Sequence, residues 1–364
     1  MIMVNNPGSW SHVYAPLLHA KWHGWTITDL VFPFFLFIVG VAVVLAFENR
    51  LAKGIERNHL VKRVIRRSII LFGLGLFLMA YPFVTFSPEL GWSEYVVRLR
   101  IMGVLQRIAI CYLVVSLLYL YASTRTQVIV SVVFLAGYWL AMTLIPVPGY
   151  GAGQLETPAG TLSAYVDRAV LGSDHLWAGA NREWEPEGLL STLPAIVTTL
   201  LGVWAGRILA SPREELERVM LLLVNGALLI AAGYVWDWFF PINKSLWTSS
   251  YTLFTGGQAF AFLGLCYYFI DLKGFERWSK PFVAYGVNAI TVYMASEVLA
   301  KTLYLIKVPD GAGGEISLSG LIYESIFSAM LPPKPASLAY AIVWIVGWYA
   351  VLALMYRRKI FIKI

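Results

Sequence analysis

The sequence predicts an all-α, polytopic integral membrane protein. Of its 364 residues, 59% are apolar and only 13% are charged, whereas soluble globular chains have roughly 45–50% and 25%. The mean hydropathy is +0.68, and apolar runs of about twenty residues, long enough to cross a hydrocarbon core about 30 Å thick, recur along the chain. These observations exclude soluble enzymes and nucleic-acid-binding proteins, so the expected surroundings are a lipid bilayer and no nucleic acid.

Nine apolar segments are long enough to form membrane-spanning helices. They lie at residues 25–47, 68–86, 101–122, 128–146, 189–210, 219–240, 250–270, 281–303 and 337–356. A shorter amphipathic stretch, 319–331, is too short to cross and is predicted to be re-entrant or interfacial. We expect a helix bundle of about nine or ten transmembrane helices plus this short helix. No internal repeat or soluble linker interrupts the chain, which predicts a single domain over residues 1–364.

The lysines and arginines predict which loops face the cytoplasm. Seven of them lie within residues 50–67, between the first two spans, and the positive-inside rule places this segment inside. Alternation of the spans then puts 18 of the 28 cations on the same side and makes the C-terminus cytoplasmic. The outer face receives residues 5–24, 147–188, 241–249 and 304–318. The net charge of +7 is therefore interpreted as a consequence of topology.

Two histidines four residues apart, His19 and His23, stand just before the first span. On a helix they would share one face, an arrangement that zinc sites use. However, Ala20 stands where a metalloprotease-like pair has glutamate, and no third ligand is apparent, so no metal is expected. The alternative is an interfacial belt of histidine and aromatic residues, since Trp22 and Trp25 suit the headgroup layer.

Asp29 and Arg107 are charged groups within apolar spans. An ionised carboxylate at the centre of a membrane helix costs about 2.5–3.5 kcal/mol by insertion scales, less near the edge, so Asp29 needs a partner. It either orients His19 and stabilises its protonated form or forms an ion pair with Arg107, and the two are compatible. Arg107, beside Gln106, is expected to bind an anionic ligand group or a buried carboxylate such as Asp29 or Glu297.

Polar and aromatic side chains gather in two predicted outer loops and in the eighth span. The loops contain Asp174, His175, Asn243, Lys244 and Trp247, and the span carries Asn288, Tyr293 and Glu297. Indoles that stack on a sugar beside amides and carboxylates that bind its hydroxyls suit a saccharide site, although solvated loops have the same composition. For Asn288 the alternative is a hydrogen bond between helices.

Blocks of matching residues follow one another along nearly the whole chain. They are His19–Thr26 running into Asp29–Gly40, Arg100–Arg107, Pro146–Gly149, Tyr165–Leu176, Glu185–Gly188, Asn243–Trp247, Asn288–Glu297 and Tyr356–Phe361. In these blocks the chain resembles the heparan-α-glucosaminide N-acetyltransferase family, multi-span enzymes that move acetyl from cytoplasmic acetyl-CoA to a terminal glucosamine across the membrane. The resemblance implies that His19 is the catalytic histidine on the outer side, with Asn5 as its companion near the acetyl group and Asp29 beside the site.

The chain departs from the family's pattern in three places. The family's first membrane helix, with an Asp and an Arg-Gly pair, is represented only by Ile2 to Val4. We expect that helix to be truncated before residue 1, either because the chain begins after it or because the true start lies upstream. The large outer N-terminal domain of the animal enzymes has no counterpart, which fits a bacterial relative in the cytoplasmic (inner) membrane and weakens heparan sulfate as the substrate. A family histidine in the eighth span is Ser296 here, so a role at that position does not carry over.

The predicted function is a membrane-embedded, acetyl-CoA-dependent N-acetyltransferase acting on the amine of a glucosamine-type sugar on the outer side. His19 acts as general base or as acetyl acceptor, Asp29 orients it, and Asn5 donates a hydrogen bond to the thioester oxygen. A homodimer is compatible with this class. The residues expected to bind substrate or acyl-CoA are Trp22, Gln106, Arg107, Asp174, His175, Asn243, Lys244, Trp247, Asn288 and Glu297.

Two further functions compete with this prediction. An amino-sugar (N-acetylglucosamine) permease would line its pathway with the polar stripe of the eighth span, but transporters often consist of two related halves and none are apparent here. A structural scaffold leaves Asp29, Arg107 and Glu297 unexplained in lipid. The basic segment 50–67 either holds the phosphates of CoA or faces lipid headgroups and water.

Overall fold

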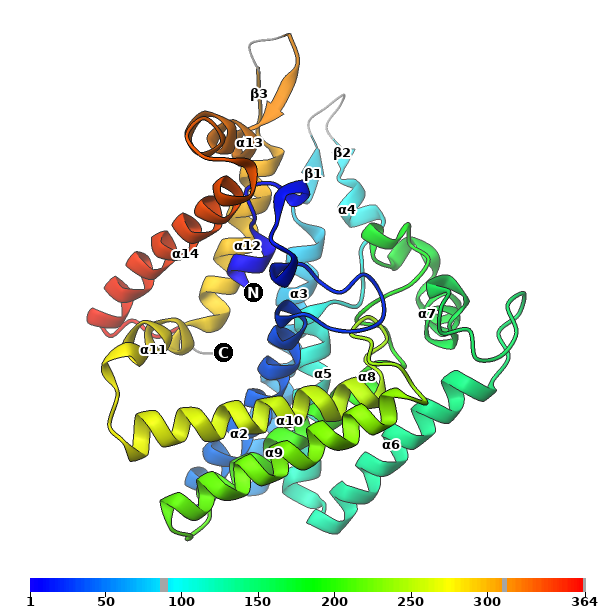
Figure 1. The fold of residues 1–364 in the computed structure, drawn as a ribbon, viewed down its shortest axis with the longest axis vertical. Coiled ribbons are helices and arrows are strands. Elements are labelled where there is room, and N and C mark those ends of the chain that lie inside the picture. Colours follow the sequence, from blue (N-terminus) through cyan, green and yellow to red (C-terminus); the bar gives the residue numbers. More distant parts are fainter. Residues whose placement is uncertain (86–90, 310–312, 363–364) are drawn as a thin grey trace. The chain divides into compact units, whose positions relative to one another are not determined.

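The protein is predominantly helical and divides into two compact units (Figure 1). The computed structural model describes residues 1–85, 91–309 and 313–362. Unit 1 comprises Met1–His19, Thr26–Thr28 and Gly274–Ile364, and unit 2 comprises Ala20–Trp25 and Asp29–Lys273. The named strands of the described residues form two short antiparallel hairpins: β1 (Val84–Thr85) with β2 (Gly91–Trp92), and β3 (Lys307–Pro309) with β4 (Glu315–Ser317). The prediction of a helical fold is confirmed.

Unit 2 is a helix bundle in which α2 packs along α8, α3 along α5 and α9 along α10 (Figure 1). The apolar side chains predicted to span the membrane fill its interior; for example, Phe37, Leu201, Leu222 and Phe260 form one buried cluster. The helices are α2 (Val31–Ala52), α3 (Arg57–Ala80), α4 (Glu94–Val97), α5 (Val104–Tyr121), α6 (Thr124–Leu144), α7 (Leu162–Leu171), α8 (Thr192–Ala210), α9 (Glu215–Asp237) and α10 (Ser249–Cys266), which continues as a π-helix over Tyr267–Leu272.

Glycines allow α2 and α8 to cross at close range. A Cβ on Gly40 would collide with the carbonyl oxygen of Thr199, and a Cβ on Gly202 would collide with that of Phe37. Small residues serve the same purpose where helices pack in membranes. The crossing fixes α2, which begins two residues after Asp29, against the helix that follows the long outer loop.

Unit 1 contains α1 (Ile2–Asn5), α11 (Lys280–Val287), α12 (Ala289–Leu305), α13 (Leu318–Ile322) with a following π-helix (Tyr323–Ser328), and α14 (Pro333–Arg357). Asn288 stands at the break between α11 and α12, where the chain bends by 71°. Its Nδ2 donates to the carbonyl of Ile360 at 3.1 Å, and its Oδ1 accepts from the N–H of Ile362 at 3.0 Å. These two hydrogen bonds hold the C-terminal tail against the bend, so Asn288 has a structural role here.

Seven helices of the described residues are long and apolar enough to cross a membrane, or up to eight if the bent pair forms one span. This is the pattern of an integral membrane protein, but the predicted number of nine or ten is not confirmed. The predicted second span lies in α3, which carries four cations between positions 62 and 67 and ends at Ala80, so its apolar part is short. The predicted eighth span is broken at Asn288. The predicted short helix at 319–331 corresponds to α13 and its π-helix.

Candidate functional site

Segments that the sequence assigns to the outer face contact one another in unit 2. The indole Nε1 of Trp22 donates to the carbonyl of Leu155 in the long outer loop at 2.7 Å. The N–H of Gly24 donates to the carbonyl of Ile242, in the turn between α9 and α10, at 2.8 Å. Segment 20–25, the long loop and this turn therefore form one surface of the unit, beside the start of α2.

Asp29 is a buried carboxylate just before α2, with 1% of the residue exposed. Its Oδ2 accepts a hydrogen bond from the N–H of Ala20 at 3.0 Å, and its main-chain carbonyl accepts one from the hydroxyl of Tyr251 on α10 at 2.5 Å. Because Ala20 directly follows His19 in the chain, this bond fixes the carboxylate to the residue next to the predicted catalytic histidine. His19 itself is the last residue of the first segment of unit 1.

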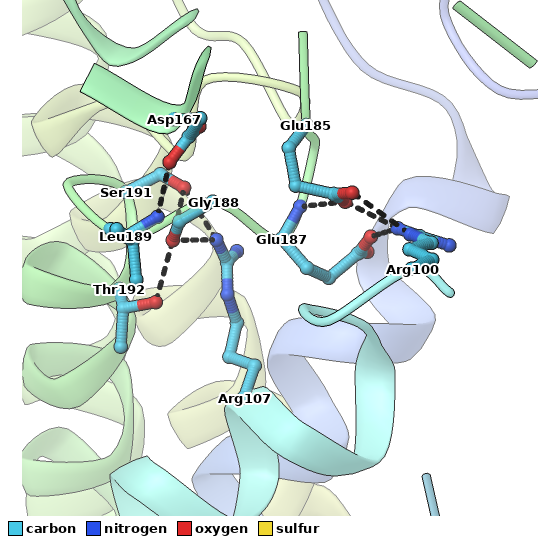
Figure 2. Close-up of polar contacts among 9 residues, drawn as sticks. All are labelled: Arg100, Arg107, Asp167, Glu185, Glu187, Gly188, Leu189, Ser191 and Thr192. Carbon is cyan, nitrogen blue, oxygen red and sulfur yellow. Dashed lines mark hydrogen bonds and ion pairs between the residues drawn. The ribbon is translucent and has the colours of Figure 1, made fainter. Parts of the chain in front are cut away.

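The loop before α8 holds a buried cluster of opposite charges (Figure 2). The guanidinium of Arg100 donates from Nε to Glu185 Oε2 at 2.9 Å and from Nη2 to Glu187 Oε2 at 2.5 Å. Burial raises the pKa of Glu185 against the opposing effect of Arg100. Burial acts in the same direction on Glu187, but Arg100, followed by Arg107 and Lys244, outweighs it and holds the pKa of Glu187 below its ordinary value. Arg100, a cation on the predicted outer side, thus pairs with two loop carboxylates.

Arg107 lies on the first turn of α5 and is fully buried. Its Nη2 donates to the carbonyl of Gly188 at 3.1 Å and to the hydroxyl of Ser191, as Figure 2 shows. Its guanidinium carbon lies 5.0 Å from the ring centroid of Trp247, a cation–π arrangement. Nε and Nη1 have no hydrogen-bond partner among the described residues. Arg107 thus bonds to the loop before α8, not to Asp29, the partner that the sequence suggested as an alternative.

Asp167 on α7 supports the same loop from the other side (Figure 2). Its Oδ1 accepts from the N–H of Leu189 at 2.8 Å, whereas Oδ2 has no hydrogen-bond partner within the described part of the chain. A Cβ on Gly188 would collide with this carboxylate, so only glycine fits there. Burial raises the pKa of Asp167 to about 6, although the Leu189 N–H and the charge of Arg107 oppose the shift.

The raised pKa of Asp167 predicts a pH-dependent stability. The folded state binds this proton more tightly than the unfolded state, so the carboxyl contributes stability in acid that is lost as the pH rises through about 6. A shift from 3.8 to about 6 corresponds to at most about 3 kcal/mol. Asp167→Asn keeps an oxygen for Leu189 and carries no charge. We expect its thermal midpoint in detergent to match the wild type near pH 4 and to exceed it by several degrees above pH 7.

The exposed Asp174→Asn variant is the control for this prediction, and its midpoint should follow the wild type at every pH. If Asp167→Asn also follows the wild type across the whole range, the assignment of a raised pKa to this carboxyl is wrong.

Asn243 and Trp247, both predicted to bind substrate, are buried within the turn between α9 and α10. The Asn243 Oδ1 accepts from the N–H of Leu246 at 2.9 Å, and its Nδ2 lies 3.3 Å from Nδ1 of His23. The Trp247 Nε1 donates to the hydroxyl of Thr198 at 3.1 Å. These contacts shape the turn and join it to segment 20–25. They account for an asparagine and a tryptophan at these positions without invoking a bound ligand.

Asp174 and His175 join the long outer loop to the segment before α5 through two contacts. Asp174 Oδ1 lies 3.4 Å from Nε of Arg98, and His175 Nδ1 lies 2.8 Å from the carbonyl oxygen of Leu99. Both partners precede Arg100 by one or two residues. These contacts join the long outer loop to the chain directly before Arg100.

Four further predicted site residues have their contacts outside the charged cluster. Trp22 contacts the ring of Trp184 edge-on, with centroids 5.4 Å apart. Gln106 is buried beside Gly75 of α3, and its amide atoms have no hydrogen-bond partner among the described residues. In unit 1, Nδ2 of Asn5 donates to Oε1 of Glu297 at 2.8 Å, so these two candidates are brought together.

The predicted pair of His19 and His23 is divided between the two units. Nε2 of His23 lies 3.2 Å from Oε1 of Glu156. Within residues 1–85, 91–309 and 313–362, no group of three His, Cys, Asp or Glu side chains is arranged to hold a metal ion.

Arg100, Asp167, Glu185, Glu187 and Ser191 were not among the site residues predicted from the sequence. Two signals pointed to them. Arg100 lies on the side of the membrane where cations are disfavoured, and Glu185–Gly188 was one of the matching blocks. Their partners are as many as 87 positions away in the chain, so spacing alone did not reveal the pairing.

The helices and the charged loop cluster define a polytopic membrane protein with a polar site beside one group of helix ends. The chain belongs to a family described as a domain of unknown function, DUF5009, whose model matches residues 6–203. It is also homologous over its full length to heparan-α-glucosaminide N-acetyltransferase of Homo sapiens, at 30% identity over 413 aligned residues, and to that of Mus musculus, at 28% over 414. The chain covers 58% of each of these relatives. The resemblance noted in the sequence is confirmed.

Proposed function

We propose that the protein is a membrane-embedded N-acetyltransferase that moves acetyl from acetyl-CoA, on the cytoplasmic side, to the amine of a glucosamine-type sugar on the outer side. The homology of this chain to two heparan-α-glucosaminide N-acetyltransferases, over 58% of their length, supports this activity. In this proposal the chain forms nine or ten spans of a bacterial cytoplasmic membrane, with its C-terminus in the cytoplasm and no metal in its site.

The observation that carries the proposal is the bond between Asp29 and Ala20. A buried carboxylate in an apolar helix is costly, and here it is fixed by a main-chain N–H at 3.0 Å, one residue from His19. A carboxylate held next to an imidazole favours its protonated form, which is what a base requires after it has taken a proton. In this proposal Asp29, bonded to the residue that follows His19, is the group that supports the imidazole.

The chemistry follows from these roles. The sugar amine attacks the thioester carbonyl, His19 takes the proton that the amine loses, and the carbon–sulfur bond breaks to release CoA. Negative charge develops on the thioester oxygen, where a hydrogen-bond donor stabilises the transition state. Asn5 suits this role because its Nδ2 carries two hydrogens and Glu297 accepts one of them.

The same imidazole can act as a nucleophile and carry the acetyl group itself. In that case the acetyl group passes first to His19, with release of CoA, and then to the sugar amine. Labelled acetyl retained on the protein in the absence of acceptor, and absent from His19→Ala, would select this route. Turnover-competent protein that retains no label would select direct transfer.

The loop cluster and the tryptophans suit the recognition of a sugar. Trp22 and Trp184 offer indole surface beside the loop that carries Glu185 and Glu187. Arg107 is fully buried, and its Nε and Nη1 have no hydrogen-bond partner among the described residues. Asn243 and Trp247 act indirectly, by shaping the turn that bears Lys244.

Purified protein incubated with labelled acetyl-CoA and glucosamine tests this function. We expect labelled N-acetylglucosamine and one free CoA thiol for each sugar acetylated. No transfer to glucosamine or to glucosamine-terminated oligosaccharides would contradict the proposal. Uptake of N-acetylglucosamine into proteoliposomes by the same preparation would then identify a permease.

A further inference from the structure

The first half of α3 turns one face toward the interior of unit 2. Leu60, Val64 and Leu71 are buried, and Leu60 and Val64 belong to one apolar cluster with Tyr112 of α5. The guanidinium carbon of Arg67 lies 5.0 Å from the ring centroid of Tyr112, a cation–π arrangement. The packing of α3 on α5 therefore accounts for Arg67, but not for the cations on the opposite face of the helix.

A hollow of about 420 Å³ lies on that opposite, exposed face and is lined by Lys62, Ile65, Arg66, Ile69 and Ile70. Because an α-helix has 3.6 residues per turn, Lys62 and Arg66 stand one turn apart in one row, and Ile65 and Ile69 form the row beside it. Ile65 is 44% exposed and Ile69 is 66% exposed. The lining thus combines two cations with exposed apolar side chains and contains no carboxylate.

The two cations of the hollow are not used by the protein itself. Neither Lys62 nor Arg66 forms an ion pair or a ring contact within residues 1–85, 91–309 and 313–362. Residues 68–80 of the same helix carry no charge. At 1.5 Å per residue, Lys62 lies about 10 Å along the helix axis from Ile69. In a bilayer this spacing puts the cations at the level of the headgroups and Ile69 beside the acyl chains.

We propose that this hollow binds one anionic phospholipid, whose phosphate is held by Lys62 and Arg66 and whose acyl chain lies on Ile65, Ile69 and Ile70. Charge complementarity supplies the first contact, since arginine and lysine are the side chains that bind phosphate. Burial of the exposed isoleucines supplies the second. The site belongs to unit 2 alone and does not depend on acetyl transfer.

The apolar part of the lining favours a lipid over the phosphates of CoA, the other ligand that the sequence suggested for segment 50–67. A nucleotide phosphate bound by Lys62 and Arg66 would leave Ile65 and Ile69 without a partner, whereas an acyl chain covers both. The hollow also faces away from the side of α3 that packs inside unit 2. The thioester of acetyl-CoA, in contrast, has to enter the protein to react.

Thermal unfolding of the purified full chain in non-ionic detergent, with added phosphatidylglycerol or phosphatidylcholine, tests the proposal. We expect phosphatidylglycerol to raise the midpoint by several degrees more than phosphatidylcholine, because a ligand of the folded state stabilises it. The double variant Lys62→Gln/Arg66→Gln should lose most of this difference. Its apparent affinity for phosphatidylglycerol should fall at least about tenfold, since each cation near an anionic lipid surface contributes roughly a fivefold factor.

Arg125→Gln/Arg213→Gln is the matched control. It removes the same charge from two exposed cations that the sequence places on the same side of the membrane, away from the hollow. This variant should keep the wild-type response to phosphatidylglycerol. Equal losses in the two double variants would show a general attraction between the protein and anionic lipid, and would overturn the proposal of a site.

Two further probes separate a lipid from a soluble phosphate. Ile69→Asn keeps both cations and should weaken the response to phosphatidylglycerol, because the acyl chain loses its apolar contact; an unchanged affinity would contradict that contact. Adenosine 3′,5′-bisphosphate, which carries phosphates of the CoA type without an acyl chain, should not compete with phosphatidylglycerol. If it stabilises the wild type but not Lys62→Gln/Arg66→Gln, the hollow binds CoA phosphates and the lipid proposal is wrong.

The proposal stays testable if the neutral variants fail to fold. Lys62→Arg/Arg66→Lys keeps both charges and should respond to phosphatidylglycerol as the wild type does. In the wild type, raising the salt concentration from about 0.05 M to about 0.5 M should weaken the effect of phosphatidylglycerol, because exposed charges are then screened over a shorter distance. An effect that salt leaves unchanged would contradict a site formed by exposed cations.

Discussion

Replacement of His19 by alanine is expected to lower acetyl transfer to glucosamine by at least 10²–10⁴-fold, about the range that a general base contributes. In the proposal the imidazole takes the amine proton or carries the acetyl, and Asp29 accepts a hydrogen bond from the N–H of the residue that follows His19. The expected loss lies in kcat, since the sugar and acyl-CoA contacts are left in place. Initial rates with labelled acetyl-CoA measure it.

His12→Ala is the matched control, because His12 lies on an exposed turn of the same N-terminal segment. It should retain wild-type rates. A His19→Ala protein that folds and still transfers acetyl within tenfold of the wild type would remove His19 from the mechanism.

Replacement of Arg100 by methionine is expected to give the largest loss of stability. The change leaves the carboxylates of Glu185 and Glu187 buried and close to each other without their shared cation. Removing one partner of a buried ion pair typically costs about 3–5 kcal/mol. The thermal midpoint in detergent measures the loss, read from the onset of aggregation or from a thiol-reactive dye at the buried Cys111.

Arg98→Met is the control for this prediction. Arg98 forms longer contacts, 3.4 Å to both Glu94 and Asp174, and its side chain is 47% exposed, so we expect less than about 1 kcal/mol. Adding Glu185→Gln and Glu187→Gln to Arg100→Met should recover part of the lost midpoint. Equal destabilisation by the Arg98 and Arg100 substitutions would contradict the importance of the buried cluster.

The helical fold followed from the sequence because it depends on local composition. Runs of apolar residues predicted α2, α5, α6, α8, α9, α10 and α14, with ends that differ by up to six residues. The prediction was less complete for features that depend on tertiary contacts. The break at Asn288 depends on hydrogen bonds to Ile360 and Ile362, more than 70 positions away, which no local pattern reports.

The site was predictable in part for the same reason. Asp29 was identifiable from a single physical rule, the cost of a carboxylate in an apolar helix. The pairing of Arg100 with Glu185 and Glu187 joins segments 85 and 87 positions apart. Residue type also did not distinguish roles: Asn243 and Trp247 suit sugar binding chemically, yet their polar atoms bond to Leu246, His23 and Thr198.

The measurement that tests the central claim most directly is acetyl transfer across a sealed bilayer. Labelled acetyl-CoA is trapped inside proteoliposomes that contain the wild type or His19→Ala, and glucosamine is supplied outside. We expect labelled N-acetylglucosamine in the outer medium, formed by the wild type and lost in the variant, while CoA stays inside. Equal label in the outer medium for both proteins, or none for an intact wild type, would contradict transmembrane acetyl transfer through His19.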